Sequence, residues 1–409
     1  MALDLYNPWI AVAALALALG TTGLLAKCQS LPADRERHTA IDGLRGFLAF
    51  FVFLHHGSIW FVQLHQHTWT TPTSNLYRHF GDSSVALFFM ITAFLFTGKI
   101  LDSQHRPIDW VRLYVARVMR LFPLYAVAVA ILWLMAWALT DWTLRVSTRQ
   151  LWTEVLNWLI FTVPRGESVN SLPHANRLMA GVTWSLPYEW WFYLGLPALA
   201  FLLRKQNPSR GWLLFGFLNV LLFKAVWHLD LRLLPFLGGV LAAYAVRNET
   251  ICRFSRLRWT GLIVLLCLGL AVKWTPTAYT PPALVLLSTA FILMACGNDL
   301  FGILSAAPSR ILGEMAYSLY LLHGLLLSFV FHWLVGWSEM ARWSEAEHWT
   351  LVVGLSVPLI LLSYAASRWI EKPAQQATPA VVAWIRRKAP APAAMTKPLT
   401  AKSRDIGPP

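Results

Sequence analysis

The ionisable residues with the most obvious chemical potential lie in a stretch that lipid is expected to surround. Residues 43–57, GLRGFLAFFVFLHHG, are as apolar as a membrane span, but they carry Arg45, His55 and His56. His56 follows Arg45 by eleven residues, roughly 16 Å along a helix, so it falls near mid-membrane if Arg45 marks the cytoplasmic boundary. A neutral imidazole is tolerated there and accepts a proton near neutral pH. His56 is therefore a candidate for a functional role such as proton transfer. The alternative is a histidine that hydrogen-bonds neighbouring helices.

The neighbouring histidine is expected to be inert. His55 points about 100° away from His56 on the same helix, so only one of the two can face a given site.

Basic residues cluster at the start of another apolar segment. In DWVRLYVARVMRLFPLY, Arg117 and Arg120 are three residues apart and share a helical face, with Arg112 further round. Guanidinium groups bind phosphates in a bidentate manner, which suits a phosphorylated cytosolic ligand such as coenzyme A. The alternative is ordinary loop charge that sets membrane topology.

Two further segments place polar groups inside apolar helices. In TWSLPYEWWFYLGLP, Glu189 is expected about a turn and a half inside a span, where a carboxylate needs a histidine or arginine partner. A structural ion pair and a chemical role both remain open. In LGEMAYSLYLLHGLLL, one helix carries polar candidates that could equally serve helix packing. They are Tyr317, Ser318, Tyr320 and His323.

The composition indicates what must position these residues. The 409 residues are 57% hydrophobic and 13% charged, about half the charged share of a soluble domain, and 22 tryptophans suit many membrane interfaces. The net charge of +14 is spread between apolar runs, so we predict no nucleic-acid partner. The four cysteines show no metal-ligand or disulfide spacing, so no metal or other bound cofactor is expected.

The sequence predicts an all-α, polytopic transmembrane bundle of about 11 spans. We divide it into an N-terminal anchor helix and linker (1–37), a transmembrane domain (38–373) and a disordered cytoplasmic tail (374–409). The segment 151–164 is apolar but short, and is expected at the membrane interface. The expected spans are 8–27, 46–64, 84–101, 121–140, 184–203, 211–228, 231–246, 258–274, 282–297, 316–336 and 350–370.

Loop charge predicts the orientation of this bundle. Of the 34 Lys and Arg residues, 25 fall in the loops on the side of Lys27 and of the tail, and 8 fall in the opposite loops. Because cytoplasmic loops carry the excess of positive charge, we expect the N-terminus outside and the C-terminus in the cytoplasm.

Five motifs in order resemble those of the acyltransferase 3 family of bacterial membrane O-acyltransferases, over roughly residues 38–373. The family's opening Arg, ten residues, then His is similar to Arg45 through His56, and its Arg-x-x-Arg element to RVMR. TWSLPYEWWFY, LGEMAYSLYLLH and WIEKP resemble its later motifs, which adds Trp184, Ser185 and Glu371 to the candidates. One departure is Ala86, where the family usually has an acid, so a role built on that acid is in doubt.

The resemblance implies a ten-helix core plus the N-terminal anchor, in the bacterial inner membrane. It also implies transfer of an acyl group, most often acetyl, from cytoplasmic acyl-CoA to a hydroxyl of a cell-envelope glycan or a polyprenyl-linked sugar. Arg45, Arg117 and Arg120 would bind the donor. His56 would act as general base or transient acyl carrier, and Glu189 would orient or charge-pair with its imidazole.

Two other classes of protein fit less well. A transporter or exporter of an acyl group, small carboxylate or glycolipid would also carry mid-membrane ionisable residues. A membrane scaffold without chemistry would not need the ordered motifs.

Overall fold

The computed structural model describes residues 5–27, 38–103, 107–162, 167–203, 209–227 and 230–388. Regular structure within these ranges is helical, and β-pairing is limited to an isolated bridge between Val169 and Leu172. The all-α prediction is confirmed.

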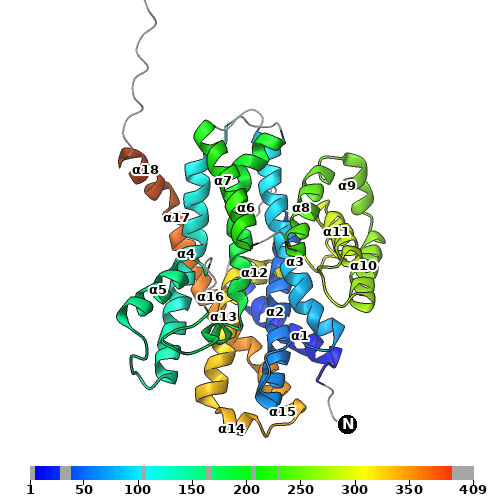
Figure 1. Cartoon of the computed structure of the whole chain (residues 1–409). Helices are drawn as coiled ribbons and strands as arrows, with labels where there is room; N and C mark the ends of the chain where they lie inside the picture. The colour runs from blue at the N-terminus through cyan, green and yellow to red at the C-terminus, as the bar shows by residue number, and fades with distance from the viewer. Residues whose placement is uncertain are drawn as a thin grey trace, which may run out of the picture.

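Long helices form the centre of the bundle (Figure 1). They are α2 (Thr39–Gln66), α3 (Asn75–Asp102), α4 (Trp110–Leu139) and α13 (Ala316–Phe329). The helix α2 contacts both α3 and α13, and 83% of its most apolar window is buried. The span that carries Arg45, His55 and His56 is therefore the most enclosed one, as expected where ionisable groups face protein rather than lipid.

A second group of helices packs beside α3 (Figure 1). α8 (Leu234–Ala245) lies on α3, and α10 (Thr260–Trp274) pairs with α11 (Pro281–Ala295). A short α9 (Glu249–Ser255) begins at Asn248, whose side chain accepts from two backbone N–H groups, and it meets α10 at 83°. On the other side of the centre, α6 (Leu186–Leu202) pairs with α7 (Arg210–Trp227).

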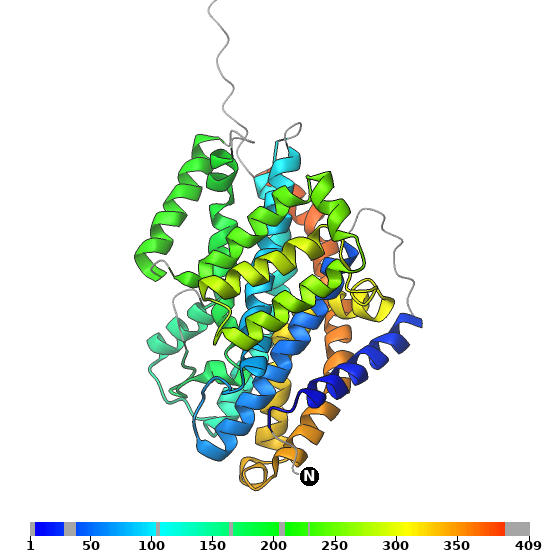
Figure 2. The same ribbon diagram turned by 90° about the vertical axis from the view of Figure 1, so that its right-hand side faces the viewer.

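The C-terminal helices complete the bundle. They are α12 (Ala307–Glu314), α14 (Trp337–Met340), α15 (Glu345–Gly354), α16 (Ser356–Ala366), α17 (Lys372–Gln376) and α18 (Thr378–Lys388). π-helical turns follow α13 at Val330–Leu334 and α16 at Ser367–Glu371. The predicted anchor, α1 (Pro8–Lys27), packs obliquely against α12, α15 and α16 (Figure 2).

α2 and α12 cross with almost no side chain between them. A β-carbon added to Gly313 would lie 1.8 Å from the carbonyl oxygen of Asp42, and one added to Gly46 would lie 2.6 Å from the backbone of Gly313. Glycine at these two positions lets the backbones approach each other, which fixes the height of Arg45 in the bundle.

The predicted number of spans is only partly matched by helix length. Six helices in the described part are long and apolar enough to cross a membrane, or seven if the bent α9–α10 pair is one span. The apolar helices near 210–222, 231–245 and 281–295 are shorter than a full crossing. Eleven spans therefore stays a prediction.

The tail expected to be disordered from residue 374 begins as helix. α17 and α18 continue through Lys388, and α18 packs against α4 with Val382 buried. The prediction was wrong for 374–388, because one apolar face among many prolines and lysines was enough to dock against the bundle. The rest of the tail lies outside the described residues.

The external loop expected at the interface contains the amphipathic helix α5 (Thr148–Leu159). Its Trp152 side is exposed, whereas Glu154 is buried and accepts from the backbone N–H of Asn170 at 2.8 Å. This bond ties α5 to the remainder of the loop.

Candidate functional site

Two adjacent cavities lie toward the end of the bundle that carries α18, and they share Leu95, Phe96 and Arg117 as lining residues. The larger, which we call the basic vestibule, has a volume of about 950 Å³ and is lined by Lys99, Arg112, Arg117 and Arg247 among other residues. The smaller, which we call the inner cavity, has a volume of about 100 Å³ and lies deeper between α3, α4, α6 and α13. Arg117 lines both of them.

The inner cavity collects most of the residues singled out from the sequence. Its walls include Arg45, Arg117, Arg120, Ser185, Glu189, Tyr317 and Tyr320. Their elements come from distant parts of the chain, so tertiary packing brings together groups that the sequence shows only as separate motifs. The Arg117 guanidinium lies 5.1 Å from the ring centre of Phe96, within range of a cation–π contact.

Glu189 lies closer to a helix start than the sequence suggested. A 3₁₀ turn at Val182–Ser185 precedes α6, which begins at Leu186 with Pro187 in its first turn, so Glu189 is also in the first turn. A proline preorganises a helix start, and a carboxylate there is stabilised by the helix dipole.

The expected pairing of Glu189 with the imidazole of His56 is not observed. Glu189 Oε1 accepts from the hydroxyl of Tyr193 and, at 3.3 Å, from the hydroxyl of Thr92. Both partners are hydroxyl donors, so the carboxylate is satisfied without a cation. Ala86, at the usual position of the acid, is fully buried in the apolar core.

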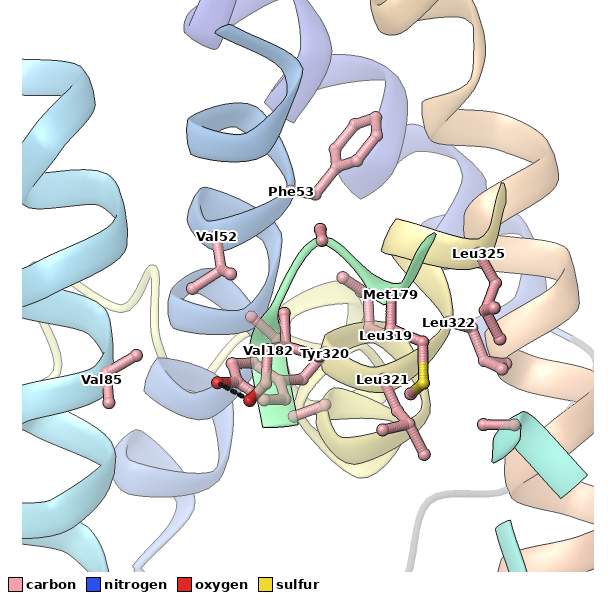
Figure 3. Packing of buried hydrophobic residues seen from close by; sticks show 14 of the residues in the cluster. Val52, Phe53, Val85, Met179, Val182, Leu319, Tyr320, Leu321, Leu322 and Leu325 are labelled. Carbon is pink, nitrogen blue, oxygen red and sulfur yellow. Dashed lines mark hydrogen bonds between the residues drawn. The ribbon is translucent and has the colours of Figure 1, made fainter. Parts of the chain in front are cut away.

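The inner cavity ends at a hydroxyl cluster on α13. The Tyr320 hydroxyl donates to the carbonyl of Val182 at 3.1 Å (Figure 3). It also lies 2.9 Å from the Ser185 hydroxyl. The Tyr320 ring is 6.3 Å, centre to centre, from the ring of His323. The cavity thus ends about one helical turn below His323.

His56 and His323 form a pair at the centre of the bundle. His56 Nδ1 and His323 Nε2 are 3.0 Å apart, and the His323 side chain is fully buried. Trp69 stacks on the far side of His56, with 6.5 Å between ring centres. Sequence reasoning selected both histidines but gave no reason to pair them.

The backbone contacts of the two rings fix their neutral tautomers. His323 Nδ1 lies 3.1 Å from the carbonyl oxygen of Leu319, and a carbonyl can only accept, so Nδ1 carries the proton and Nε2 is an acceptor. His56 Nδ1 must then donate, to His323 Nε2 and to the carbonyl of Val52 at 3.0 Å. The Nε2 atom of His56 is left with its lone pair available.

His55 points toward α3, as its position on the helix predicted, although its ring lies edge-on to the ring of His56 with 4.9 Å between ring centres. Its Nδ1 donates to the carbonyl of Tyr77 at 2.7 Å, and its ring fills the space that a side chain at Gly81 would need. It therefore joins α2 to α3.

Ser318 and Glu371 form a second buried contact, near the arginines of the inner cavity. The Ser318 hydroxyl donates to the carboxylate of Glu371, which is 4% exposed. Glu371 ends the π-helical turn Ser367–Glu371. The extra residue in such a turn rotates the side chains that follow, and no periodicity in the sequence signalled it.

The other two candidates from the sequence, Tyr317 and Trp184, make contacts in the walls of the cavities. The Tyr317 hydroxyl donates to the carbonyl of Leu121 at 2.8 Å, which joins α13 to α4. Trp184 points toward the opposite end of the bundle, with the Arg232 guanidinium 5.1 Å from its ring centre.

Sequence reasoning missed the walls of the basic vestibule. Lys99 and Arg247 were counted only as loop charge, and the pairing of Arg247 with Asp102 across two helices could not be seen. Their one signal was their place on the side with excess positive charge. Among the described residues, no three His, Cys, Asp or Glu side chains are grouped closely enough to hold a metal ion.

Asp109 closes one edge of the vestibule. It caps α4 by accepting from the N–H of Arg112 at 3.1 Å, and it pairs with Arg386 of α18. Slight burial raises the pKa of Asp109, but these two partners outweigh it and hold the pKa below its usual value.

Comparison with known proteins agrees with this arrangement. The sequence profile of the acyltransferase 3 family, described as an acyltransferase domain, matches residues 38–368. The chain belongs to this family. It is also similar to the acyltransferase MdmB of Streptomyces mycarofaciens, at 24% identity over 386 residues that cover 84% of this chain and 93% of that protein. No solved structure matches the chain.

Family membership makes the protein a membrane acyltransferase that transfers groups other than aminoacyl groups. The apolar helices described above agree with a multi-pass protein. The matched region begins with His38, one residue before α2, so the anchor α1 precedes it.

Proposed function

We propose that the protein transfers an acyl group, most often acetyl, from cytoplasmic acyl-CoA to a hydroxyl of a cell-envelope glycan or polyprenyl-linked sugar. It would do so across the bacterial inner membrane, with its N-terminus outside and α18 in the cytoplasm. The observation that carries this proposal is the pair of adjacent cavities, the inner of which is lined by Tyr320, one helical turn from His323 of the His56–His323 pair.

The basic vestibule suits the nucleotide part of the donor. Its volume is typical of a site for a small molecule, and guanidinium and ammonium groups are the usual partners of phosphates. Lys99, Arg112 and Arg247 would bind the phosphates. Arg117 would contact the donor arm, the part of acyl-CoA that extends from the phosphates to the thioester. This assignment needs no bound cofactor, since acyl-CoA is a substrate.

The inner cavity suits the end of the donor arm. Arg45 and Arg120 are its positive groups, and Glu189 is its negative one. We propose that Glu189 accepts a hydrogen bond from an amide N–H of the arm. The small volume of this cavity favours a short acyl group such as acetyl over a long chain.

His56 would then act through its Nε2 atom. In the general-base route, Nε2 removes the proton of the acceptor hydroxyl while the oxygen attacks the thioester carbonyl. The carbon–sulfur bond breaks, and the CoA sulfur takes up the proton, which leaves an ester and free CoA. In the acyl-carrier route, Nε2 attacks the thioester first and CoA leaves as its thiolate; the acceptor hydroxyl then takes the acyl group from Nε2, and its proton passes to the CoA sulfur.

His323 would act as a positioning residue in either route. Its Nε2 accepts from His56 Nδ1–H, so it holds the tautomer in which His56 Nε2 is free. When His56 becomes positively charged, this hydrogen bond strengthens, because one partner is then ionised.

Glycan mass spectrometry of a deletion strain tests the proposal. We expect the envelope glycan or lipid-linked sugar to lose the mass of one acyl group per repeat, and the wild-type gene but not His56→Ala to restore it. An unchanged glycan would contradict the proposal.

Inverted membrane vesicles supplied with radiolabelled acetyl-CoA separate the transferase from a transporter. A transferase leaves the label in a covalent ester that alkali releases. A transporter leaves it as free small molecules inside the vesicles, which would overturn the proposal.

A further inference from the structure

A third cavity, of about 260 Å³, lies apart from the two that face α18. We call it the polar cavity; its walls include Glu167, Asn176, Trp184, Tyr188, Asp230 and Arg232. They come from the loop before α6, the start of α6, and the connection between α7 and α8. Loop charge assigns both connections to the outer side of the membrane. The polar cavity therefore opens on the side opposite to the proposed donor.

A hydrogen bond and an ion pair hold the charged groups of the polar cavity in place, but these groups remain accessible to a ligand. Asp230 Oδ2 accepts from the Tyr188 hydroxyl at 3.1 Å, and Arg232 Nε lies 3.6 Å from the same oxygen. The side chains of Asp230 and Arg232 are still 34% and 48% exposed, respectively. A carboxylate and a guanidinium beside the aromatic rings of Trp184 and Tyr188 can bind the hydroxyl groups and the apolar face of a sugar.

One amide oxygen in the wall lacks a hydrogen bond within the described chain. Asn176 Oδ1 is buried, and no donor from the described residues reaches it. A buried acceptor without a donor is costly and calls for a ligand that can donate. A sugar hydroxyl is such a donor, whereas a phosphate is not.

The wall of the polar cavity contacts residues beside the histidine pair. Gly181 and Thr183 line the cavity, while the carbonyl of Val182 between them accepts from the Tyr320 hydroxyl. Arg177, next to Asn176, lies 5.8 Å from the ring centre of Trp69, which stacks on His56. The segment that lines the polar cavity and Trp69 thus lie between a ligand there and His56.

We propose that the polar cavity binds a sugar ring of the acceptor other than the one that is acylated. This assignment rests on the proposed function, because the role of the site is to hold the acceptor beside His56, on the side opposite to the donor. Hydroxyl groups of this ring would donate to Asn176 Oδ1 and Asp230 and accept from Arg232.

The kinetic test uses purified full-length protein in liposomes, with acetyl-CoA and oligosaccharides released from the envelope glycan. Asp230→Asn keeps a cap for the 3₁₀ turn that follows but loses the charge. We expect it to raise the acceptor KM roughly tenfold, as for one lost hydrogen bond to a charged group, with the acetyl-CoA KM unchanged. Asp141→Asn is the matched control, because it removes the charge of another ion pair in an external loop. Equal effects of the two substitutions, or none of either, would overturn the site.

Asn176→Leu separates binding from folding. Replacing an amide whose oxygen is buried without a partner by an apolar group of similar size should raise the thermal midpoint, while the acceptor KM rises. A purely structural role predicts the reverse, a lower midpoint with unchanged KM, and that result would overturn the site.

A binding test works even if no acyl transfer occurs. Methyl glucoside and N-acetylglucosamine, each at millimolar concentration, should raise the thermal midpoint of the wild type but not of Asp230→Asn. Sugar binding of this kind without any acylated product would contradict the proposed function and keep the site. Acyl transfer with wild-type acceptor KM in both cavity variants would contradict the site and keep the function.

Discussion

The two faces of the molecule are polar in different ways. The basic vestibule and inner cavity bring together Lys99 and several arginines around few carboxylates, whereas the polar cavity has two carboxylates, Glu167 and Asp230, and a single arginine. An excess of positive charge suits a polyanion, and carboxylate acceptors beside one guanidinium donor suit neutral hydroxyl groups. This contrast supports the proposal that the two sides bind chemically different substrates.

The largest effect is expected at His56, between the two sides. We expect His56→Ala to abolish acyl transfer, a loss of at least about 100-fold, because Nε2 is the lone pair that both proposed routes use. The measurement is acetyl transfer per folded protein in proteoliposomes. His55→Ala is the matched control and should be much milder, since His55 faces α3. Substantial activity in His56→Ala would contradict the assignment.

The second test asks whether the His323 ring positions its neighbour. His323→Ala should lower kcat by roughly 10- to 100-fold, the worth of a hydrogen bond to a charged group, with little change in either KM. His323→Asn, which retains an acceptor oxygen, should recover part of the loss. The pH dependence of kcat must also change, because His56 loses the partner of its Nδ1–H. A fall in folded protein with unchanged kcat would show a structural role instead.

A substitution at the donor site is expected to weaken donor binding without changing acceptor binding. Arg117→Ala should raise the KM for acetyl-CoA by roughly tenfold or more and leave the acceptor KM unchanged, because a charge-assisted contact to the donor is lost. Arg117→Lys should be intermediate, since an ammonium lacks the bidentate fork. An exposed arginine outside the cavities, Arg253, serves as the control for loss of charge. Equal effects of Arg117→Ala and Arg253→Ala would contradict the vestibule as donor site.

The smallest effect is expected at the edge of the vestibule. Asp109→Asn removes the charge that pairs with Arg386, and exposed pairs contribute only about 0.2–1 kcal/mol. Hydrogen exchange of α18 should increase, while transfer activity changes less than about twofold. Because the pKa of Asp109 is lowered in the folded state, its contribution is present at neutral pH and lost as the pH falls through that value. Docking of α18 should therefore weaken in acid for the wild type but not for Asp109→Asn.

Motif order proved more informative than the polar residues taken singly. Each candidate had a plausible packing role, and several do pack: Tyr317 joins α13 to α4, and Ser318 donates to Glu371. The inner cavity forms only when α3, α4, α6 and α13 are assembled, because its residues come from segments that span more than 200 positions of the chain. Glu189 illustrates the limit: its place within an apolar helix was foreseen, but its partners Thr92 and Tyr193 were not.

The sequence by itself determined the class of protein. Long apolar runs force helices, because backbone groups in lipid must be paired within the segment, and the spacing of Arg45 and His56 follows from the rise of a helix. The sequence also determined that His55 and His56 face different ways. These are local consequences of the chain, and local periodicity is enough to predict them.

Only the tertiary structure decided which polar groups meet. The contact of His56 with His323, and hence the tautomer that frees Nε2, depends on how α2 and α13 pack. The π-helical turn that directs Glu371 inward, the docking of α18, and the polar cavity between three separate segments depend on packing in the same way. Such contacts join residues far apart in the chain, and no spacing within a single helix encodes them.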